Sequence, residues 1–345
     1  MLERHVPRLD VPWQPIGNWP TPIERLELDG RPLWCKCEGD SHPLYGGNKI
    51  RTLEAWLGHA RAVDASRIWA IGAYGSNHAV ATVLHARAIG LDAAAVVFPQ
   101  PTSPWAVENC GALIATGCEV IRLRSWAEVP FVAAWLARRD RRCVVMPPGG
   151  ATPIGTFGAM AAAFELAEQI AAGVAPPPSR IVLPIGSTCT TAGLLAGLAL
   201  AHAVGAWRWP VPLVHGVRVT PWPITSRVRI AHLAQRTLAR VERLAGIRVA
   251  IGLRELIARL VVDGRELGRG YGRTTPQCEA AMTTLVGPRL DAVYSGKAAA
   301  ALLRLHRAGV GPLLFWASKS TAVMTPPSRE ALAKASPAIV RWLAT

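Results

Sequence analysis

Lysine is scarce in this chain of 345 residues. It occurs only at positions 36, 49, 297, 319 and 334, and the other 33 of the 38 basic residues are arginine. The formal net charge is +15, yet the arginines are scattered singly or in pairs, with no basic run and no interleaved aromatic residues. A nucleic-acid-binding surface normally gathers its cations on one face or stripe. We therefore expect no nucleic-acid partner.

The sequence also lacks a hydrophobic run long enough to span a membrane. The nearest candidate, residues 191–206, consists mostly of small residues and carries His202, whereas a spanning helix needs about 20 apolar residues. The first residues, Met1-Leu2-Glu3-Arg4-His5, lack the charged-then-apolar layout of a signal peptide. These features predict a cytoplasmic protein without a membrane partner.

Paired cysteine spacing is absent as well. The seven cysteines are an odd number, and only Cys35 and Cys37 lie close together, at alternating positions of a predicted strand. Such a pair is a weak metal signal, so we interpret the cysteines as reduced and expect no metal site. An apolar content of 50% with 18% charged residues indicates a well-buried globular protein.

Strands and helices are predicted to alternate in the first half of the chain. Short apolar runs separated by helical patterns of about 15 residues indicate βαβ units and a parallel sheet. The predicted strands lie near 68–73, 93–98, 118–123 and 142–147, and the predicted helices near 76–90, 103–117 and 126–140. We assign residues 52–160 to a small α/β domain.

A second α/β series is predicted to follow a long helix over Pro153–Ala172. Residues 1–33 are predicted to form an extended arm, and Leu33–Glu38 a strand. Further strands are expected near 180–185, 213–219, 259–262 and 312–316, with helices near 190–206, 226–245, 276–286, 296–309 and 327–343. The fold predicted is α/β, with two doubly wound, open parallel-sheet domains and the ligand in the cleft between them. The large domain comprises 1–51 and 161–345.

The hexapeptide Gly46-Gly47-Asn48-Lys49-Ile50-Arg51 precedes an amphipathic helical pattern. Glycines let a backbone approach a flat ligand closely, and a lysine held there can be partly desolvated, which favours its neutral amine. The same residues could also form an ordinary surface turn. The hexapeptide alone leaves both interpretations open.

Two strand-to-helix loops carry further polar residues. Ser76-Asn77-His78 opens a helix after the strand 68–73, where free N–H groups favour an anion such as a carboxylate. Gly186-Ser187-Thr188-Cys189-Thr190-Thr191-Ala192-Gly193 follows the strand 180–185. A loop of Gly, Ser and Thr at a helix N-terminus is typical of a phosphate cradle. Its spacing fits neither a Walker loop nor a dinucleotide fingerprint, and a simple tight turn is the alternative.

These motifs, together with Asp291-Ala292-Val293-Tyr294-Ser295-Gly296-Lys297, follow one another in a known order. The sequence resembles the pyridoxal phosphate-dependent enzymes of the D-cysteine desulfhydrase and 1-aminocyclopropane-1-carboxylate deaminase family. The resemblance covers nearly the whole chain. It implies the tryptophan synthase β-like fold (fold type II), pyridoxal 5'-phosphate as cofactor, a small amino acid as substrate and a homodimer.

The resemblance also implies roles for single residues. Lys49 matches the Schiff-base lysine, which also moves the α-proton, and Asn77 matches the partner of the ring hydroxyl. Ser76, Tyr271 and Tyr294 match catalytic positions on the substrate side of the ring. The remaining matches are to the phosphate loop (Gly186, Ser187, Thr188, Cys189, Thr190), to further cofactor contacts (Ser295, Ser318) and to the substrate site (Asn48, Ser76, Asn77, His78). Lys319, where the family has a glycine, is assigned to the substrate site as well.

Three departures from the family pattern affect the expected chemistry. Ser295 stands where the deaminases have a glutamate that pairs with the pyridine nitrogen. A neutral hydroxyl makes the cofactor a weaker electron sink, which argues against ring opening and favours elimination or replacement. Ala317-Ser318-Lys319-Ser320 replaces a His-Thr-Gly-Gly loop, and Thr188-Cys189 replaces two glycines. Lys319 either extends into solvent or points into the cleft, where it would pair with a substrate carboxylate or act as a second acid/base. Replacement of the whole loop favours the inward orientation.

The function predicted is that of a lyase that eliminates a β-substituent from a small amino acid and releases a 2-oxo acid and ammonia. A β-replacement or other tailoring enzyme of specialised metabolism is the alternative within the same cofactor class. A non-catalytic homologue that only binds the cofactor is the alternative of another class, although Lys49, Asn77, Tyr271 and Tyr294 are all present.

Overall fold

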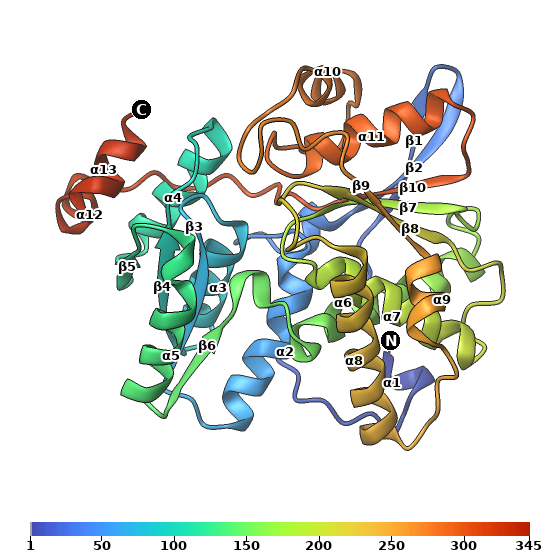
Figure 1. Cartoon of the computed structure of the whole chain (residues 1–345), viewed down its shortest axis with the longest axis horizontal. Coiled ribbons are helices and arrows are strands. Elements are labelled where there is room, and N and C mark those ends of the chain that lie inside the picture. Colours follow the sequence, from blue (N-terminus) through green and yellow to red (C-terminus); the bar gives the residue numbers. More distant parts are fainter. Residues whose placement is uncertain (1) are drawn as a thin grey trace.

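A six-stranded sheet forms one half of the molecule in the computed structural model, which describes residues 2–345 (Figure 1). Its strand order is β1-β2-β10-β7-β8-β9, and every neighbouring pair is parallel except β1 and β2. The strands are β1 (Ile23–Leu28), β2 (Arg31–Cys37), β7 (Arg180–Ile185), β8 (Leu213–Arg218), β9 (Leu260–Asp263) and β10 (Leu313–Ala317).

The antiparallel β1–β2 pair corrects the prediction of an extended arm over residues 1–33. Asp29 and Gly30 both have positive φ, at 50° and 70°, in the turn between the two strands. An Asp-Gly pair between two strands is a strong hairpin signal because both residues tolerate that conformation. Asp29 and Gly30 therefore make this hairpin predictable from the sequence, although the interpretation of an extended arm did not use them.

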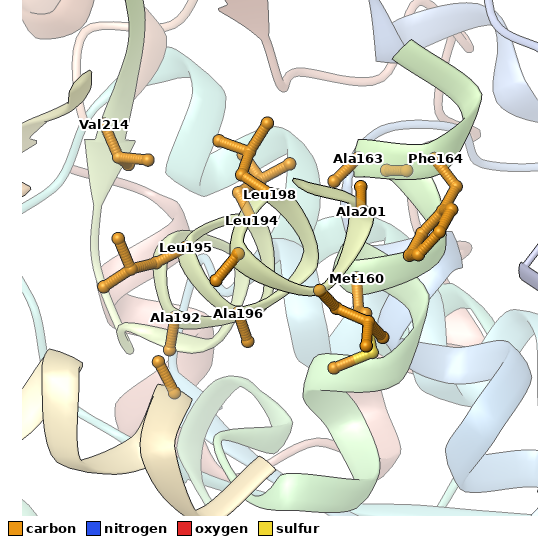
Figure 2. Packing of buried hydrophobic residues seen from close by; sticks show 14 of the residues in the cluster. Met160, Ala163, Phe164, Ala192, Leu194, Leu195, Ala196, Leu198, Ala201 and Val214 are labelled. Atoms are coloured by element: carbon orange, nitrogen blue, oxygen red, sulfur yellow. The ribbon is translucent and has the colours of Figure 1, made fainter. Parts of the chain in front are cut away.

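Helices cover both faces of this sheet. On one face lie α6 (Pro153–Ala171), α7 (Cys189–Ala203) and α8 (Arg227–Ala245), and on the other α10 (Pro276–Thr284) and α11 (Ser295–Arg307). Figure 2 shows how Leu194, Leu195 and Leu198 of α7 pack with Met160 and Phe164 of α6 in the larger core. The short helices α1 (Leu2–His5) and α9 (Leu253–Ala258) complete this half.

A four-stranded, fully parallel sheet forms the other half, with strand order β5-β4-β3-β6. Its strands are β3 (Arg67–Ala73), β4 (Asp92–Phe98), β5 (Val120–Arg122) and β6 (Cys143–Met146), and its helices are α3 (Asn77–Ala88), α4 (Pro104–Ala115) and α5 (Val129–Arg139). Helix α2 (Lys49–Ala62) lies between the halves, because it contributes to the core of the small sheet and packs along α6. Both predicted parallel-sheet domains are thus present.

The chain ends beside the small sheet. Two short helices, α12 (Arg329–Lys334) and α13 (Pro337–Leu343), pack against α4, and Trp342 Nε1 donates to Gln100 O at 2.8 Å. The single helix predicted over 327–343 is therefore wrong. The backbone is extended at Ala335, and Pro337 disfavours helical geometry at Ser336, the residue before it. The predicted domain boundaries, which assign residues 161–345 to the large domain, remain a prediction. This terminal segment packs against the small-sheet half instead.

Three short 3-10 turns connect these elements: Glu38–Ser41, Trp126–Glu128 and Pro148–Gly150. Within residues 2–345, none of the helices has the length and apolar character required to cross a membrane. The same range holds no group of three or more His, Cys, Asp or Glu side chains arranged to hold a metal ion.

Candidate active site

Lys49 is the first residue of α2 and lies where the two halves of the molecule meet. A β-carbon at Gly149 would lie 3.6 Å from Lys49 Nζ and 2.0 Å from Ser187 Oγ. The lysine amine thus faces both the 148–150 turn and the loop after β7. Removal from water lowers the pKa of Lys49, and the charge of an ionised Cys189 thiol would raise it by a smaller amount. The neutral amine is therefore easier to form here than on a surface lysine.

The two glycines before Lys49 are required by close backbone contacts. A β-carbon at Gly46 would lie 1.9 Å from Gly39 O, and one at Gly47, whose φ is +95°, would lie 2.6 Å from Ser318 O. The lysine loop is therefore pressed against the loop 317–320. Ser320 Oγ accepts a hydrogen bond from Gly46 N at 2.8 Å, and Ser318 O accepts one from Asn48 N at 3.4 Å. The altered loop is part of the site.

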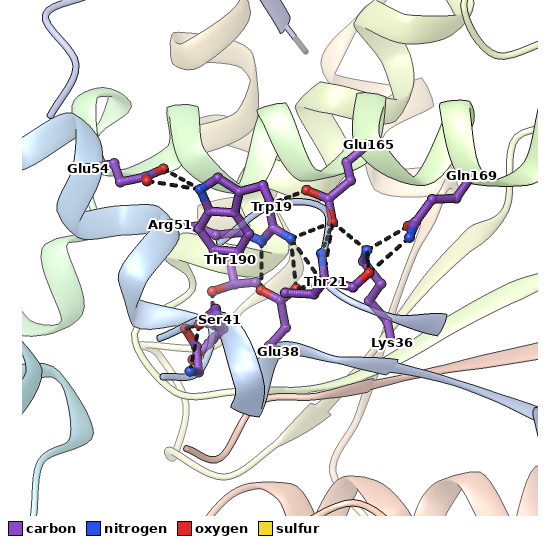
Figure 3. A network of polar contacts seen from close by, with 12 residues as sticks. Trp19, Thr21, Lys36, Glu38, Ser41, Arg51, Glu54, Glu165, Gln169 and Thr190 are labelled. Atoms are coloured by element: carbon purple, nitrogen blue, oxygen red, sulfur yellow. Dashed lines mark hydrogen bonds and ion pairs between the residues drawn. The ribbon is translucent and has the colours of Figure 1, made fainter. Parts of the chain in front are cut away.

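A buried ionic network holds the first turn of α2 (Figure 3). The guanidinium of Arg51 donates to Glu38 at 2.6 and 2.8 Å and to Glu165 at 2.8 and 3.0 Å. Lys36 pairs with the same Glu165, so two cations balance two carboxylates. Because these side chains come from β2, the following turn, α2 and α6, the network joins all four segments through Arg51, two residues after Lys49. Burial by itself would raise the pKa of Glu165, but the charges of Arg51 and Lys36 lower it to about 2.

The loop after β7 has the form expected of an anion cradle. Thr188 has φ +79° and precedes α7, whose first N–H groups have no partner within the helix. Asn48 Nδ2 donates to Thr190 Oγ1 at 2.9 Å, which ties the lysine loop to this cradle. Cys189 Sγ donates to Gly150 O at 3.5 Å. The cradle and the lysine loop are thus held together.

The segment Ser76-Asn77-His78 opens α3 as predicted. Ser76 Oγ accepts the N–H of Ala79 at 3.2 Å and is the N-cap of the helix. The side-chain oxygen of Asn77 accepts from Tyr45 Oη at 2.6 Å and from Asn109 Nδ2 at 2.9 Å, which leaves its N–H₂ group for another acceptor. His78 is buried, and neither ring nitrogen has a partner among the described residues. Burial, and then the charge of Lys49, lower the pKa of His78 to about 3, so its ring is neutral.

Lys319 does not extend into solvent. Its side chain is 1% exposed, and its Nζ donates to Glu108 Oε2 at 3.4 Å and to Asn109 Oδ1 at 3.3 Å. Glu108 also accepts from Arg289 at 2.7 Å. Lys319, Asn77, Asn109, Asp291 and Tyr294 line one small pocket. The inward orientation is the one that the sequence interpretation favoured, although the partners observed are protein side chains.

Tyr271 and Tyr294 form a pair whose hydroxyl groups lie 2.6 Å apart. Burial raises the pKa of Tyr271 to about 12 and that of Tyr294 well above its usual value, so both remain protonated. Ser295 is fully buried, donates to Asp291 Oδ2 at 2.9 Å and accepts from Asp291 N at 2.8 Å. Its hydroxyl is therefore occupied within the turn that begins α11.

Several features of this structure fit pyridoxal phosphate. The unpaired ring nitrogens of His78 and the unpaired hydroxyl of Thr188 are buried polar atoms, which normally have partners. A ligand with a phosphate, a ring hydroxyl and a carboxylate can supply partners of this kind. Glycines at 149 and 186 let the backbone approach the same side chains closely, because a β-carbon there would lie 2.0 Å from Ser187 Oγ and 2.9 Å from the Tyr294 ring.

Comparison with solved structures defines the class. The structure matches an ACC deaminase homologue with a TM-score of 0.74 at 27% sequence identity, over 94% of this chain and 96% of that one. A fungal L-serine ammonia-lyase from Rhizomucor miehei shares the fold at 17% identity, with a TM-score of 0.58 over 88% of this chain and 94% of that one. The fold is therefore fold type II of the pyridoxal phosphate enzymes.

Sequence comparison gives the family. A family model described as pyridoxal-phosphate dependent enzyme matches residues 15–311. A putative 1-aminocyclopropane-1-carboxylate deaminase of Pyrococcus horikoshii is 31% identical over 88% of each chain, and D-cysteine desulfhydrase of Yersinia pestis is 28% identical over 90% of this chain and 92% of that one. The chain belongs to the pyridoxal phosphate-dependent enzymes of the 1-aminocyclopropane-1-carboxylate deaminase and D-cysteine desulfhydrase family.

A third relative has a different activity in its name. Nocardicin C-9' epimerase of Nocardia uniformis subsp. tsuyamanensis is 36% identical over 199 residues, which span 55% of this chain and 60% of that protein. Its identity is higher than that of the two relatives above, but the match is shorter.

Sequence interpretation missed four residues that contact the predicted site residues. Tyr45 and Asn109 hold the Asn77 amide, Glu108 binds Lys319, and Asp291 holds Ser295. Asn109 and Glu108 lie in the middle of α4, where no motif distinguishes them from ordinary polar helix residues. Asp291 lies within the motif 291–297. Its spacing of four residues from Ser295, at the start of a helix, is the sequence feature that could have indicated their contact.

Proposed function

We propose that this enzyme is a lyase that removes a β-substituent from a small amino acid and releases a 2-oxo acid and ammonia. Ser295 is the observation that carries this choice. It stands where the resemblance places a glutamate in the deaminases, and its hydroxyl is bonded to Asp291. Without a carboxylate at the ring nitrogen, the deep electron withdrawal needed for ring opening is weaker. Elimination of a β-substituent requires less electron withdrawal by the cofactor ring than ring opening does.

The cofactor, when bound, withdraws electrons from the substrate's α-carbon. The loop from Gly186 to Thr190 and the N-terminus of α7 would hold its phosphate, and the Asn77 N–H₂ group would donate to its ring hydroxyl oxygen. Burial lowers the pKa of Lys49, so its neutral amine forms more readily and can accept the α-proton.

The substrate is held by the start of α3 and by the neutral His78. The Ser76 hydroxyl accepts from Ala79 N, so its own proton remains free to bind a carboxylate oxygen. Tyr294 stays protonated because burial raises its pKa. It can therefore donate a proton to the leaving group, with Tyr271 holding its hydroxyl at 2.6 Å.

A second candidate function is stereochemical inversion at the α-carbon, a tailoring reaction. It is favoured by the 36% identity to nocardicin C-9' epimerase. Inversion needs proton removal on one face of the carbon and proton return on the other. Ser76 opens α3 of the small-sheet half and Lys49 lies where the two halves meet, and on this proposal they act from opposite faces.

One experiment separates the two candidates. The holoenzyme is incubated in D₂O with D-cysteine, β-chloro-D-alanine, D-serine and their L-enantiomers, and products are followed by NMR. Elimination predicts a 2-oxo acid with ammonia. Deuterium at the α-carbon and formation of the other enantiomer, without a 2-oxo acid, would favour inversion. A Lys49→Ala control should do neither.

A further inference from the structure

A chain of side-chain amides connects Lys319 with Asn77. Lys319 Nζ donates to Asn109 Oδ1 at 3.3 Å, and Asn109 Nδ2 donates to Asn77 Oδ1 at 2.9 Å. Asn109 Nδ2 also donates to the backbone oxygen of Gly75 at 3.0 Å. Asn109 is 3% exposed, so water does not compete for these bonds.

The Lys319 ammonium and the Gly75 carbonyl determine the orientation of the Asn109 and Asn77 side-chain amides. An ammonium group can only donate, and a backbone carbonyl can only accept. Asn109 must therefore direct its oxygen to Lys319 and its nitrogen to Gly75 and Asn77. Asn77 then receives a donor and must direct its oxygen inward. Its N–H₂ group is left to face the pocket.

Tyr45 supports this arrangement but cannot replace Lys319. Its hydroxyl lies 2.6 Å from Asn77 Oδ1 and 3.1 Å from Asn109 Oδ1, and it has a single proton for the two acceptors. When that proton goes to Asn77, as the shorter distance favours, Lys319 is the donor that remains for Asn109 Oδ1. A hydroxyl can also accept, whereas an ammonium cannot reverse its role.

We propose that Lys319 is a positioning residue which, through Asn109, holds the Asn77 amide with its N–H₂ group toward the ring hydroxyl oxygen of pyridoxal phosphate. This proposal rests on the placement of the cofactor in the proposed function, but not on the reaction catalysed. It differs from the expectation that Lys319 binds a substrate carboxylate. The Lys319 ammonium already has a carboxylate partner, Glu108, at 3.4 Å.

The consequence is a cofactor effect that appears without substrate. A donor to the ring oxygen stabilises its ionised form. If the Asn77 amide is free to turn, the ring oxygen faces a mixture of donor and acceptor, and its protonated form gains population. Pyridoxal phosphate should then bind more weakly, and its absorbance in the lysine-bound state should shift to shorter wavelength.

The test uses Lys319→Met and Asn109→Asp in the full-length protein. Methionine keeps the length of the stem but cannot donate, and Glu108 keeps Arg289 as a partner, so no carboxylate is left unpaired. Aspartate at 109 offers only oxygens and should turn the Asn77 amide around. Lys334→Met is the matched control, because the Lys334 side chain is 73% exposed and its ion pair is with the exposed Glu330.

Each apoprotein is titrated with pyridoxal phosphate and its absorbance spectrum recorded. We expect Kd to rise about tenfold for Lys319→Met and more for Asn109→Asp, which corresponds to the loss of one hydrogen bond to a charged group. Both spectra should shift, and that of Lys334→Met should not. Unchanged Kd and spectrum in Lys319→Met would overturn the proposal, whatever Asn109→Asp does. A change confined to the substrate KM would overturn it too, in favour of substrate binding.

Failure of this proposal can be distinguished from failure of the proposed function. The titration contains no amino acid, so its result does not depend on which reaction the enzyme catalyses. Conversely, absence of both elimination and inversion in the D₂O experiment would leave the cofactor titration fully interpretable. A double variant gives a further check. If Lys319 and Asn109 act through the same amide, their effects on Kd should be far from additive.

Discussion

At the scale of single residues, the position of Lys49 comes from the backbone around it. The glycines at 46 and 47 bring its loop within contact of Gly39 and Ser318, and Gly149 brings the 148–150 turn against Ser187 of the loop after β7. The same close packing removes the amine from water and lowers its pKa. Placement and reactivity therefore have one physical cause.

Replacement of Lys49 by alanine is the most direct test at this scale. Lys49→Ala should lose the yellow absorbance of lysine-bound cofactor, which borohydride bleaches in the parent enzyme, and should lose turnover. The fold should survive, because Lys49 is not part of the buried ionic network. Absorbance, activity and thermal unfolding are compared with Lys334→Ala as control. Full activity of Lys49→Ala would contradict the assignment of this site.

At the scale of elements, α2, α6 and α7 approach one another through glycines. A β-carbon at Gly158 of α6 would lie 1.8 Å from Arg51 O of α2, and one at Gly193 of α7 would lie 2.6 Å from Thr156 O of α6. Backbone atoms cannot move aside as side chains can. Glycine is therefore needed for the helix spacing that carries Lys49 toward the phosphate loop.

Gly158→Ala should force α2 and α6 apart. Over-packing costs about 1–3 kcal/mol, and the better helix propensity of alanine offsets at most about 1 kcal/mol. We expect a net loss of stability in denaturant unfolding, together with weaker binding of pyridoxal phosphate, because Lys49 lies two residues from Arg51. Gly264→Ala serves as control, since the nearest atom to its β-carbon position is Arg218 Nη1 at 3.5 Å, an ordinary contact. Equal stability of both variants would show that the helices can adjust.

At the scale of the whole molecule, the ionic network of Arg51, Glu38, Glu165 and Lys36 joins the edge hairpin, the central helix α2 and α6. It is fully enclosed and electrically balanced. Removing one member leaves an uncompensated buried charge, which is more costly than the net contribution of the intact pair. We therefore expect this network to control global stability.

Glu165→Gln should destabilise the protein by about 3–5 kcal/mol at neutral pH. The folded-state pKa of Glu165 is lowered to about 2 from 4.5. Its ionic stabilisation is therefore complete above pH 4.5 and is lost as the pH falls through about 2, by roughly 3 kcal/mol in total. Unfolding measured against pH should show this loss in the parent and not in the variant. Glu168→Gln, on the same helix but 33% exposed, should behave like the parent.

Two further expectations concern the whole molecule. The homodimer and the cytoplasmic location, both predicted from the sequence, stay predictions. Sedimentation equilibrium of the holoenzyme should give twice the mass of one chain, because the resemblance implies a homodimer. A single-chain mass at micromolar concentration would contradict that expectation.

The sequence by itself determined the two-sheet α/β fold, the cofactor and the family. Repeated strand–helix periodicity is a local property, and the motifs around Lys49, Asn77, Gly186 and Tyr294 lie in the order typical of the family. The β1–β2 hairpin was also encoded locally, in Asp29-Gly30, but was overlooked.

Only the tertiary structure decided the direction of Lys319 and the partners of Asn77 and Ser295. Lys319 is separated from Asn109 by 210 residues and Tyr45 from Asn77 by 32, so no local pattern couples them. Whether a loop lysine meets solvent or a buried amide depends on which helix packs opposite it. Here that helix is α4 of the other half, and its approach turns Lys319 inward.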